Sequence, residues 1–283
     1  MKKRPMPKLQ NLPILLKIMR RTPIGDSLGV MNRVFGSTIS QNGICWVETA
    51  SGYPWKLDLS DSCHRWMVYG DYSDSGFWSW AREYIPEDGV IVDSGTNIGQ
   101  FIPYYAEIIE NGRILGFEPS LYCREWVREC LAVNPDIPAE IVPKGLGSEP
   151  DRLTLKNTEA AHGLWGTISQ DESSGGEEVT ITTLTETIQD RDIQEISLWK
   201  LDVEGHEFEA LKGAEKLLAD GRIRSMFVEV HPENRREEVE YLEKHGYPAH
   251  RIQPGGELTT VHDHPREETN LLFLHHSVLS TRE

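Results

Sequence analysis

Residues 90–101, VIVDSGTNIGQF, decide the fold of this chain. Three apolar residues precede Asp93, and Gly95, Asn97 and Gly99 follow it at every second position. This order predicts a buried strand, a glycine-containing turn and the start of a helix, as in nucleotide-binding α/β domains. The turn needs glycine because residues without a Cβ let the backbone bend sharply and approach a ligand closely.

Strand-like and helix-like segments alternate from this point onward. Repeated units of this kind predict a parallel sheet with helices on both faces. Two further segments predict an antiparallel hairpin, 152–156 and 179–182, with a mobile polar loop at 169–178 between them. We expect strands of the main sheet at residues 90–93, 113–118, 138–143, 197–202, 225–230 and 269–277. We expect helices at residues 98–110, 120–133, 183–191, 204–219 and 233–245, the third of which begins with a capping box from Thr183 to Glu186.

The first 64 residues differ from this pattern and predict an N-terminal extension, with the ligand-binding domain at residues 65–283. Residues 12–19, LPILLKIM, predict a short amphipathic helix rather than a signal peptide, because Pro13 and Lys17 interrupt the apolar run. We expect this helix to pack against the domain, with docking to a membrane or a partner as the alternative.

An aromatic-rich block separates this extension from the glycine loop. Residues 44–60 predict two short strands around a turn. The block that follows predicts either a hydrophobic cap on the core or the wall of a substrate pocket. Its aromatic residues are Trp66, Tyr69, Tyr72, Phe77, Trp78 and Trp80.

The composition limits the class of protein and its partners. The chain has 283 residues, 38% hydrophobic and 26% charged, which fits one large globular α/β domain with an extension. A net charge of −16 argues against a nucleic-acid backbone or an anionic membrane as the main partner. No stretch approaches a membrane span, and four cysteines in a chain of this length do not form a secreted disulfide framework. We therefore expect a cytoplasmic location.

Polar residues follow the predicted strands at one edge of the sheet. Ligands of parallel α/β sheets bind beyond the carboxyl ends of the strands, so these residues form the candidate site. They are Asp93 and the glycine loop after the first strand, Glu118, Pro119 and Ser120 after the second, Gly145 after the third, Asp202 and His206 after the fourth, and Glu229 and His231 at the end of the fifth.

The glycine loop distinguishes between two kinds of nucleotide cofactor. A dinucleotide fold requires G-x-G-x-x-G, but residues 95–99, GTNIG, have Asn97 in place of the middle glycine. Such a loop with Asp93 before it suits the aminoacyl end and the ribose of S-adenosylmethionine, which has no phosphate. Glu118, nineteen residues past Gly99, would accept hydrogen bonds from the two ribose hydroxyls.

At these residues the chain resembles the FkbM-type S-adenosylmethionine-dependent methyltransferases. The resemblance covers residues 65–275 and is most specific in LWKLDVEGHEFEALKGA at 198–214. The family implies the class I methyltransferase (Rossmann-like) fold, an α/β architecture whose seven-stranded, mostly parallel sheet has an antiparallel last strand. It also implies methyl transfer to a hydroxyl, usually on a sugar or a natural product. The chain departs from the family pattern at 94–96 and at 162–169, and the second departure, near the expected pocket, leaves the acceptor open.

The family chemistry implies a cofactor-binding role for the residues near the first two strands. Glu118 would hold the ribose, and Ser120 and Gly145 would approach the adenine. The full set is Asp93, Gly95, Thr96, Asn97, Gly99, Glu118, Pro119, Ser120, Gly145 and Asp202.

The same chemistry implies catalytic roles for the residues after the fourth and fifth strands. Asp202 would contact the amino end of the cofactor or the acceptor. His206 and His231 are candidate general bases, because a neutral imidazole accepts a proton near pH 7. Glu229 would orient the acceptor or raise the basicity of a nearby histidine.

Several alternatives stay open at this point. His206 would otherwise lie in the first turn of a helix, and His231 in a turn after a strand. Asp202, Glu204, Glu229 and His231 would together offer an oxygen-rich site for a divalent metal, although O-methyl transfer does not require one. The rival functions are an NAD(P)-dependent oxidoreductase and a non-catalytic S-adenosylmethionine-binding module. The expected partner is a small-molecule or glycan acceptor, and a homo-oligomer is compatible with the sequence.

Overall fold

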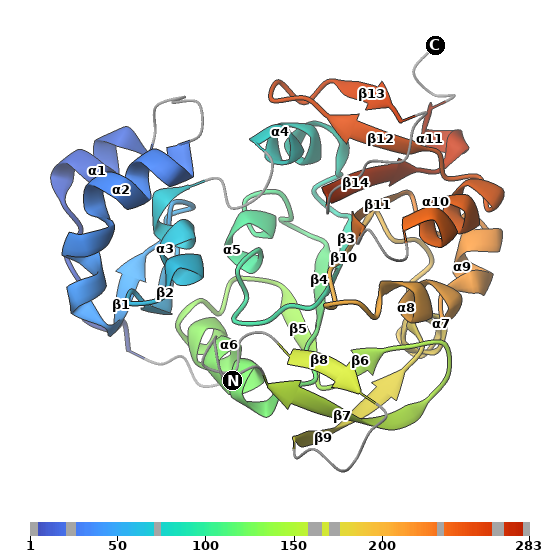
Figure 1. The fold of residues 1–283 in the computed structure, drawn as a ribbon, viewed down its shortest axis with the longest axis horizontal. Helices are drawn as coiled ribbons and strands as arrows, with labels where there is room; N and C mark the ends of the chain where they lie inside the picture. The colour runs from blue at the N-terminus through green and yellow to red at the C-terminus, as the bar shows by residue number, and fades with distance from the viewer. Residues whose placement is uncertain are drawn as a thin grey trace.

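An eight-stranded sheet forms the centre of the molecule (Figure 1). The computed structural model describes residues 5–20, 27–70, 75–157, 166–169, 176–230, 235–261 and 269–279. The strands lie in the order β13-β12-β14-β11-β10-β3-β4-β5. Their bounds are β3 (Val90–Ser94), β4 (Arg113–Phe117), β5 (Ala139–Val142), β10 (Leu198–Leu201), β11 (Ser225–Val230), β12 (Ala249–Ile252), β13 (Leu258–Thr260) and β14 (Thr269–Leu274).

The pairing of the strands follows the predicted pattern with one addition. Strands β5, β4, β3, β10 and β11 are parallel neighbours. The last strand, β14, pairs antiparallel with β11 along its whole length, which confirms that expectation. The sheet has eight strands rather than seven, because β13 pairs antiparallel with β12 at the outer edge. A turn with Gly256 at φ 91° closes this extra hairpin.

Helices cover both faces of the sheet, as predicted, because successive strand residues point to opposite faces. Ile91 and Phe227 pack with residues of α4, α5 and α6 on one face. Val92 and Val228 pack with residues of α7, α8, α9 and α10 on the other. The bounds are α4 (Ser75–Tyr84), α5 (Ile102–Tyr105), α6 (Leu121–Val133), α7 (Leu184–Gln189), α8 (Glu207–Lys212), α9 (Glu215–Ala219) and α10 (Arg235–Lys244), and α11 (His276–Leu279) follows β14.

Two of the expected helices are wrong in length. The helix expected at 98–110 shortens to the four residues of α5, because Gly99 has a left-handed backbone with φ 80°. The helix expected at 204–219 divides into α8 and α9. At the division, Gly213 lies so close to Gly147 that a Cβ on Gly213 would be 2.0 Å from the Gly147 carbonyl oxygen.

Within the described ranges, every helix is too short or too polar to traverse a bilayer.

The first 70 residues, as far as they are described, form an N-terminal module at one end of the molecule (Figure 1). Its two strands pair antiparallel, as predicted. Helix α2 was not predicted, because glycine, serine and threonine in it are poor helix formers. Met31, Phe35 and Ile39 are nevertheless buried at a spacing of four residues, so packing stabilises the helix. The bounds are α1 (Ile14–Met19), α2 (Ser27–Ile39), the 3₁₀ helix η1 (Ser40–Asn42), β1 (Ile44–Glu48), β2 (Pro54–Asp58) and α3 (Ser62–Tyr69).

The N-terminal module docks on α6 through its second strand. The Trp126 indole N–H donates to the Lys56 carbonyl at 2.7 Å, and the Asn134 amide donates to the Pro54 carbonyl at 2.8 Å. The predicted division of the chain after residue 64 stays a prediction, and α3 runs across that position.

The aromatic block forms part of the core. Phe77 stacks on Phe227 of the sheet with ring centroids 4.1 Å apart. Trp78 stacks on Tyr104 at 4.8 Å, and both tryptophans of α4 are buried. These contacts favour the hydrophobic cap over the pocket wall for this part of the block. Tyr72 lies outside the described residues.

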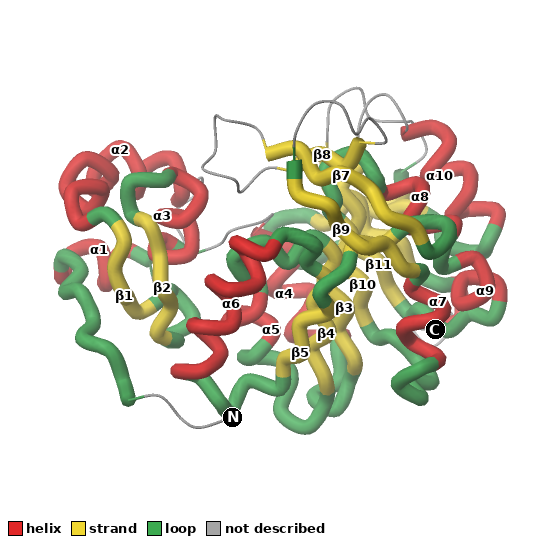
Figure 2. The backbone as a smooth tube through the Cα atoms, turned by 90° about the horizontal axis from the view of Figure 1, so that it is seen from below, coloured by secondary structure: helices red, strands yellow, loops and turns green. Residues whose placement is uncertain are grey.

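A second sheet of four strands lies beyond the carboxyl ends of the central strands (Figure 2). The predicted antiparallel pairing is confirmed, because β7 and β9 pair with Leu153 opposite Val179, although β8 lies between them in the chain and pairs with the other edge of β7. The polar loop predicted at 169–178 is shorter, since Ser169 ends β8 and Glu177 begins β9, while residues 170–175 lie outside the described ranges. In the order β6-β9-β7-β8, the bounds are β6 (Gly145–Leu146), β9 (Glu177–Thr182), β7 (Asp151–Asn157) and β8 (Gly166–Ser169).

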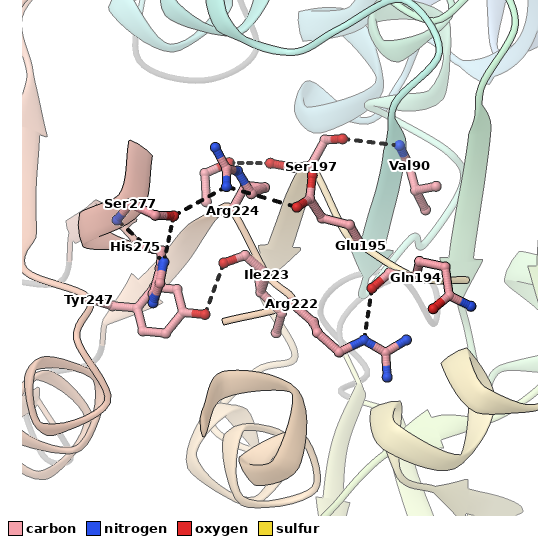
Figure 3. Close-up of polar contacts among 11 residues, drawn as sticks. Val90, Gln194, Glu195, Ser197, Arg222, Ile223, Arg224, Tyr247, His275 and Ser277 are labelled. Carbon is pink, nitrogen blue, oxygen red and sulfur yellow. Dashed lines mark hydrogen bonds and ion pairs between the residues drawn. The ribbon is translucent and has the colours of Figure 1, made fainter. Parts of the chain in front are cut away.

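A polar network joins the amino ends of the central strands (Figure 3). The Ser197 hydroxyl accepts from the Val90 N–H at 3.2 Å, and the Ser225 hydroxyl donates to the Ser197 carbonyl at 2.6 Å. Arg224 donates to the Ser277 hydroxyl at 3.2 Å and thereby ties β11 to the C-terminal helix α11. This end of the sheet is therefore held together by its own side chains.

The cap of α7 tests the local rules by which the helices begin. The Thr183 hydroxyl accepts from the Glu186 N–H at 3.1 Å, as the capping pattern predicts. We expect Thr183→Ala to lower the free energy of unfolding by about 1 kcal/mol in urea denaturation, because the N–H loses its partner. Thr183→Ser keeps the oxygen and should stay close to the wild type. Equal losses in both variants would contradict the capping role.

Candidate functional site

The loop after β3 turns sharply at Gly95, where φ is 80°. A Cβ at this position would lie 1.8 Å from the Asp202 carbonyl oxygen, so the contact requires glycine. The Asp202 N–H also donates to the Ser94 carbonyl at 3.2 Å. These contacts bring the carboxyl ends of β3 and β10 against each other.

Gly99 faces the N-terminal module. Its φ is 80°, and a Cβ there would lie 2.7 Å from the ring of Trp55. The Trp55 indole N–H donates to the Ile98 carbonyl at 2.9 Å, and the ring is fully buried. The structure thus gives Gly99 a packing role against β2. Trp55 was missed as a site residue, because it lies 43 positions before Ile98 and no local pattern connects the two.

Thr96 and Asn97 hold the same loop against β4. The Thr96 N–H donates to the Phe117 carbonyl at 3.1 Å, and its hydroxyl donates to the Asp93 carbonyl at 2.9 Å. Asn97 has a left-handed backbone with φ 51°, which turns its N–H toward Glu118. The loop therefore presents a backbone donor to the end of β4.

Glu118 is a buried carboxylate held by two loops. Its oxygens accept from the Asn97 N–H and the Ser120 N–H, each at 2.8 Å. Burial raises the pKa of Glu118 to about 7, although these two N–H groups oppose the shift. The two N–H groups thus fix the orientation of the Glu118 carboxylate, but they stabilise its ionised form less than burial destabilises it.

The other residues predicted to bind cofactor lie around Glu118. Pro119 follows it directly, and the buried Ser120 is the N-cap residue of α6. Gly145 lies in β6, just past the carboxyl end of β5, and pairs with Ile181 of β9. The structure therefore brings all three to the predicted edge of the sheet.

Lys200 is a buried cation between two carboxylates and was not among the predicted site residues. Its Nζ lies 2.8 Å from Asp202 Oδ2 and 3.9 Å from Asp93 Oδ1. It also lies 4.7 Å from the centroid of the Phe101 ring. One sequence signal could have identified Lys200. It lies two residues before Asp202, and alternate residues of an extended segment share a face.

Burial shifts both members of this ion pair. It raises the pKa of Asp93 to about 6, and Lys200 opposes that shift. It lowers the pKa of Lys200, but Asp202 and Asp93 outweigh it and the net shift is upward. The buried Tyr105 hydroxyl lies next to Asp93. The pair is therefore a strongly polar group inside an apolar core.

Glu229 reaches the same cluster from β11 and hydrogen-bonds to Asp202. Burial, followed by the charges of Asp202 and Glu204, raises the pKa of Glu229 to about 9. This shift favours the protonated form of Glu229 beside Asp202.

Glu207 shapes the turn between β10 and α8. Its buried carboxylate accepts from the Val203 N–H at 2.8 Å and the Gly205 N–H at 3.2 Å. Two residues of this turn, Glu204 and Gly205, have left-handed backbones with φ 56° and 91°. The turn that follows Asp202 is thus held by an internal carboxylate.

The two predicted histidines differ in what the structure describes. His206 is half-buried at the N-cap position of α8, and its Nε2 would lie 3.5 Å from a Cβ at Gly147. Burial lowers its pKa. His231 lies outside the described residues, so its role stays a prediction. Among the residues that are described, no group of three or more His, Cys, Asp or Glu side chains is arranged to hold a metal ion.

The site thus consists of two groups joined by the glycine loop: the buried Glu118 carboxylate, and a charged cluster around Lys200. A family model described as the methyltransferase FkbM domain matches residues 93–249, more than half of the chain. The chain belongs to this family.

The chain is also similar to individual proteins. The methyltransferase sdnD of Sordaria araneosa is 29% identical over 162 residues, which are 47% of this chain and 62% of that protein. The chain therefore spans less than two thirds of that relative. A crystal structure of methyltransferase FkbM from Methylobacillus flagellatus has 17% identity and a TM-score of 0.48, covering 67% of this chain and 44% of that one. SMU.1697c, a Streptococcus mutans putative methyltransferase in complex with SAH, has 9% identity and a TM-score of 0.42, covering 70% and 94%.

The contact between Trp55 and the glycine loop can be tested against a matched tryptophan. Trp126 also donates its indole N–H to a backbone carbonyl, but to Lys56 rather than to the loop. We expect Trp55→Phe and Trp126→Phe each to lose about 1 kcal/mol of stability, because each loses one buried hydrogen bond. Only Trp55→Phe should speed amide hydrogen exchange at residues 97–101, measured by mass spectrometry. Equal exchange in the two variants would contradict a role of Trp55 in holding the loop.

Proposed function

We propose that this chain is an S-adenosylmethionine-dependent O-methyltransferase that acts on a hydroxyl of a sugar, a glycan or a secondary metabolite. Membership of the FkbM family supports methyl transfer. The observation that most directly supports the cofactor is the buried Glu118 carboxylate, which two backbone N–H groups hold beside the glycine loop.

Glu118 fits the ribose of this cofactor. Each carboxylate oxygen accepts one backbone hydrogen bond at 2.8 Å and keeps acceptor capacity for a further donor. Its pKa of about 7 supports the same role, because two ribose hydroxyls would supply the stabilisation that burial removes.

The cofactor, when bound, would supply an electrophilic methyl group. The glycine loop would hold its methionine end, and Ser120 and Gly145 would lie toward its adenine. The residues proposed to bind it are Asp93, Gly95, Thr96, Asn97, Gly99, Glu118, Pro119, Ser120, Gly145 and Asp202.

Asp202 is the proposed contact to the acceptor or to the cofactor's amino group. Lys200 donates to it at 2.8 Å, while 32% of the Asp202 side chain stays exposed. Glu229, whose raised pKa favours its protonated form, lies beside it. Asp202 can therefore accept a hydrogen bond from a hydroxyl and orient it for in-line attack. His206 and His231 remain the candidate proton acceptors.

The cysteines support the proposed cytoplasmic location. All four are free thiols, and Cys123 and Cys130 are buried in the core, where burial raises the pKa of each. Free thiols are typical of reducing compartments.

Ligand-dependent melting tests the proposal against its rivals. We expect S-adenosylhomocysteine to raise the melting temperature, because a ligand that binds only the native state stabilises it, by about 2.7 kcal/mol at a hundredfold excess over its Kd. NADH should have no effect. A shift with NADH alone would reject the proposal in favour of an oxidoreductase. A shift with S-adenosylhomocysteine, but no methylated product from a panel of sugars and hydroxylated metabolites, would leave only a binding module.

The pH dependence of binding tests the position of the ribose. Ribose hydroxyls would donate to the ionised carboxylate of Glu118. In the protein without ligand, the pKa of Glu118 is raised to about 7. Affinity for S-adenosylhomocysteine should therefore fall about tenfold as the pH drops from about 8 to about 6, because binding must first remove a proton.

A matched pair of variants completes this experiment. Glu118→Gln should weaken binding at the higher pH by about 1–3 kcal/mol and remove the tenfold step. Glu140→Gln alters an exposed carboxylate of β5. It should change neither the affinity at the higher pH nor the tenfold loss of affinity at the lower pH. Calorimetry that finds the same step in Glu118→Gln would mean that the ribose binds elsewhere.

A further inference from the structure

The N-terminal module holds most of the large apolar side chains that are exposed. Among the described residues nine such side chains are exposed, and six of them lie in this module. The other three are Tyr84, Leu121 and Tyr122. The six are Met6, Ile14, Leu15, Ile18, Val34 and Ile44.

Helix α1 presents three of these side chains on one face. Ile14 and Ile18 lie one turn apart and Leu15 lies beside them, with exposures of 78%, 57% and 56%. Leu16 points the other way and is fully buried. The helix therefore packs on the core through Leu16, as expected, but its wider apolar face is turned outward.

Buried contacts on the inner side of α1 fix its orientation. Arg20, the residue after the helix, forms an ion pair with Glu48 of β1 at 2.8 Å, and its side chain is almost completely buried. The buried Leu16 and this ion pair together fix which face of the helix meets the solvent. The ion pair also offsets the negative charge of Glu48, the acidic residue at the end of β1.

The charge of this part of the chain is opposite to that of the rest. The first 70 residues contain ten lysines and arginines and four acidic residues, a net charge of +6. The remaining residues contain 19 basic and 41 acidic side chains, a net charge of −22. The overall net charge of −16 therefore includes a basic segment at the N-terminus. At physiological salt, charges more than about 8 Å from a surface are largely screened, so the acidic remainder weakens the attraction of this segment to an anionic surface only a little.

We propose that the exposed face of α1 docks on the surface of an anionic lipid membrane. An apolar helix face with basic residues nearby is the combination that binds such an interface, because the apolar side chains enter the headgroup region and the cations attract acidic lipids. Lys8 is exposed just before the helix and Lys17 lies half-buried within it.

The position of α1 in the molecule suits this orientation. The N-terminal module lies at one end of the longest axis, and α9 and α10 lie at the other (Figure 1). A membrane that attracts the basic module repels the acidic remainder, so the long axis would stand away from the surface. Docking through this face would not cover the carboxyl end of the central sheet.

Vesicle co-sedimentation with the full chain tests the proposal. We expect binding to phosphatidylcholine vesicles that contain phosphatidylserine, and little binding to phosphatidylcholine alone. Binding should weaken strongly from about 0.1 M to about 1 M NaCl, over which the Debye length falls from about 10 to about 3 Å. Ile14→Ser/Ile18→Ser should reduce the partition coefficient at least about tenfold. Lys8→Ala and Lys17→Ala should each reduce it about fivefold.

Tyr84→Ser is the matched control, because Tyr84 is an exposed apolar side chain outside the module. It should bind vesicles as the wild type does, and melting curves should show that all variants are folded. Equal binding of wild type and Ile14→Ser/Ile18→Ser would overturn the proposal, as would equal binding to neutral and anionic vesicles or no binding to either. Sedimentation velocity provides one more outcome. A wild-type dimer that Ile14→Ser/Ile18→Ser makes monomeric, without vesicle binding, would assign the face to a second copy of the chain.

Discussion

The site depends on the close backbone contact between Gly95 and Asp202. A Cβ at Gly95 would lie 1.8 Å from the Asp202 carbonyl oxygen, so the loop after β3 can rest on the end of β10 only with glycine there. Because the two strand ends meet, the Lys200 ammonium lies between Asp93 and Asp202, at 3.9 and 2.8 Å. The same loop then reaches across β4 and donates its Asn97 N–H to Glu118. One steric constraint therefore arranges both groups of the site.

The charged cluster is poorly balanced by its own residues. Burying a charge is unfavourable unless it is paired, and here Lys200 is shared by Asp93 and Asp202, with Glu229 close by. The raised pKa values of Asp93, about 6, and Glu229, about 9, are the consequence. A cationic ligand would relieve this excess of carboxylates. The sulfonium and ammonium groups of the proposed cofactor have that charge, whereas the pyrophosphate of a dinucleotide has the opposite one.

The N-terminal module is joined to the site on one side and free on the other. Trp55 of β2 supports the glycine loop through the Ile98 carbonyl, although the family model begins only at Asp93. The outer side of the module presents the apolar face of α1. The N-terminal module therefore contacts the loop that shapes the site and, on its other side, exposes the apolar face of α1.

Hydrophobic periodicity and the alternation of strands and helices are local properties, so the sequence predicted a parallel sheet, the segments that form its strands and the residues that end them. It thereby placed Asp93, Glu118 and Asp202 at one edge of the sheet. The fold was needed to show that Trp55 packs on Gly99, that Lys200 pairs with Asp93, and that the outer face of α1 is exposed. Each of these depends on contacts, or their absence, between elements far apart in the chain, and a linear pattern does not record which distant surfaces meet.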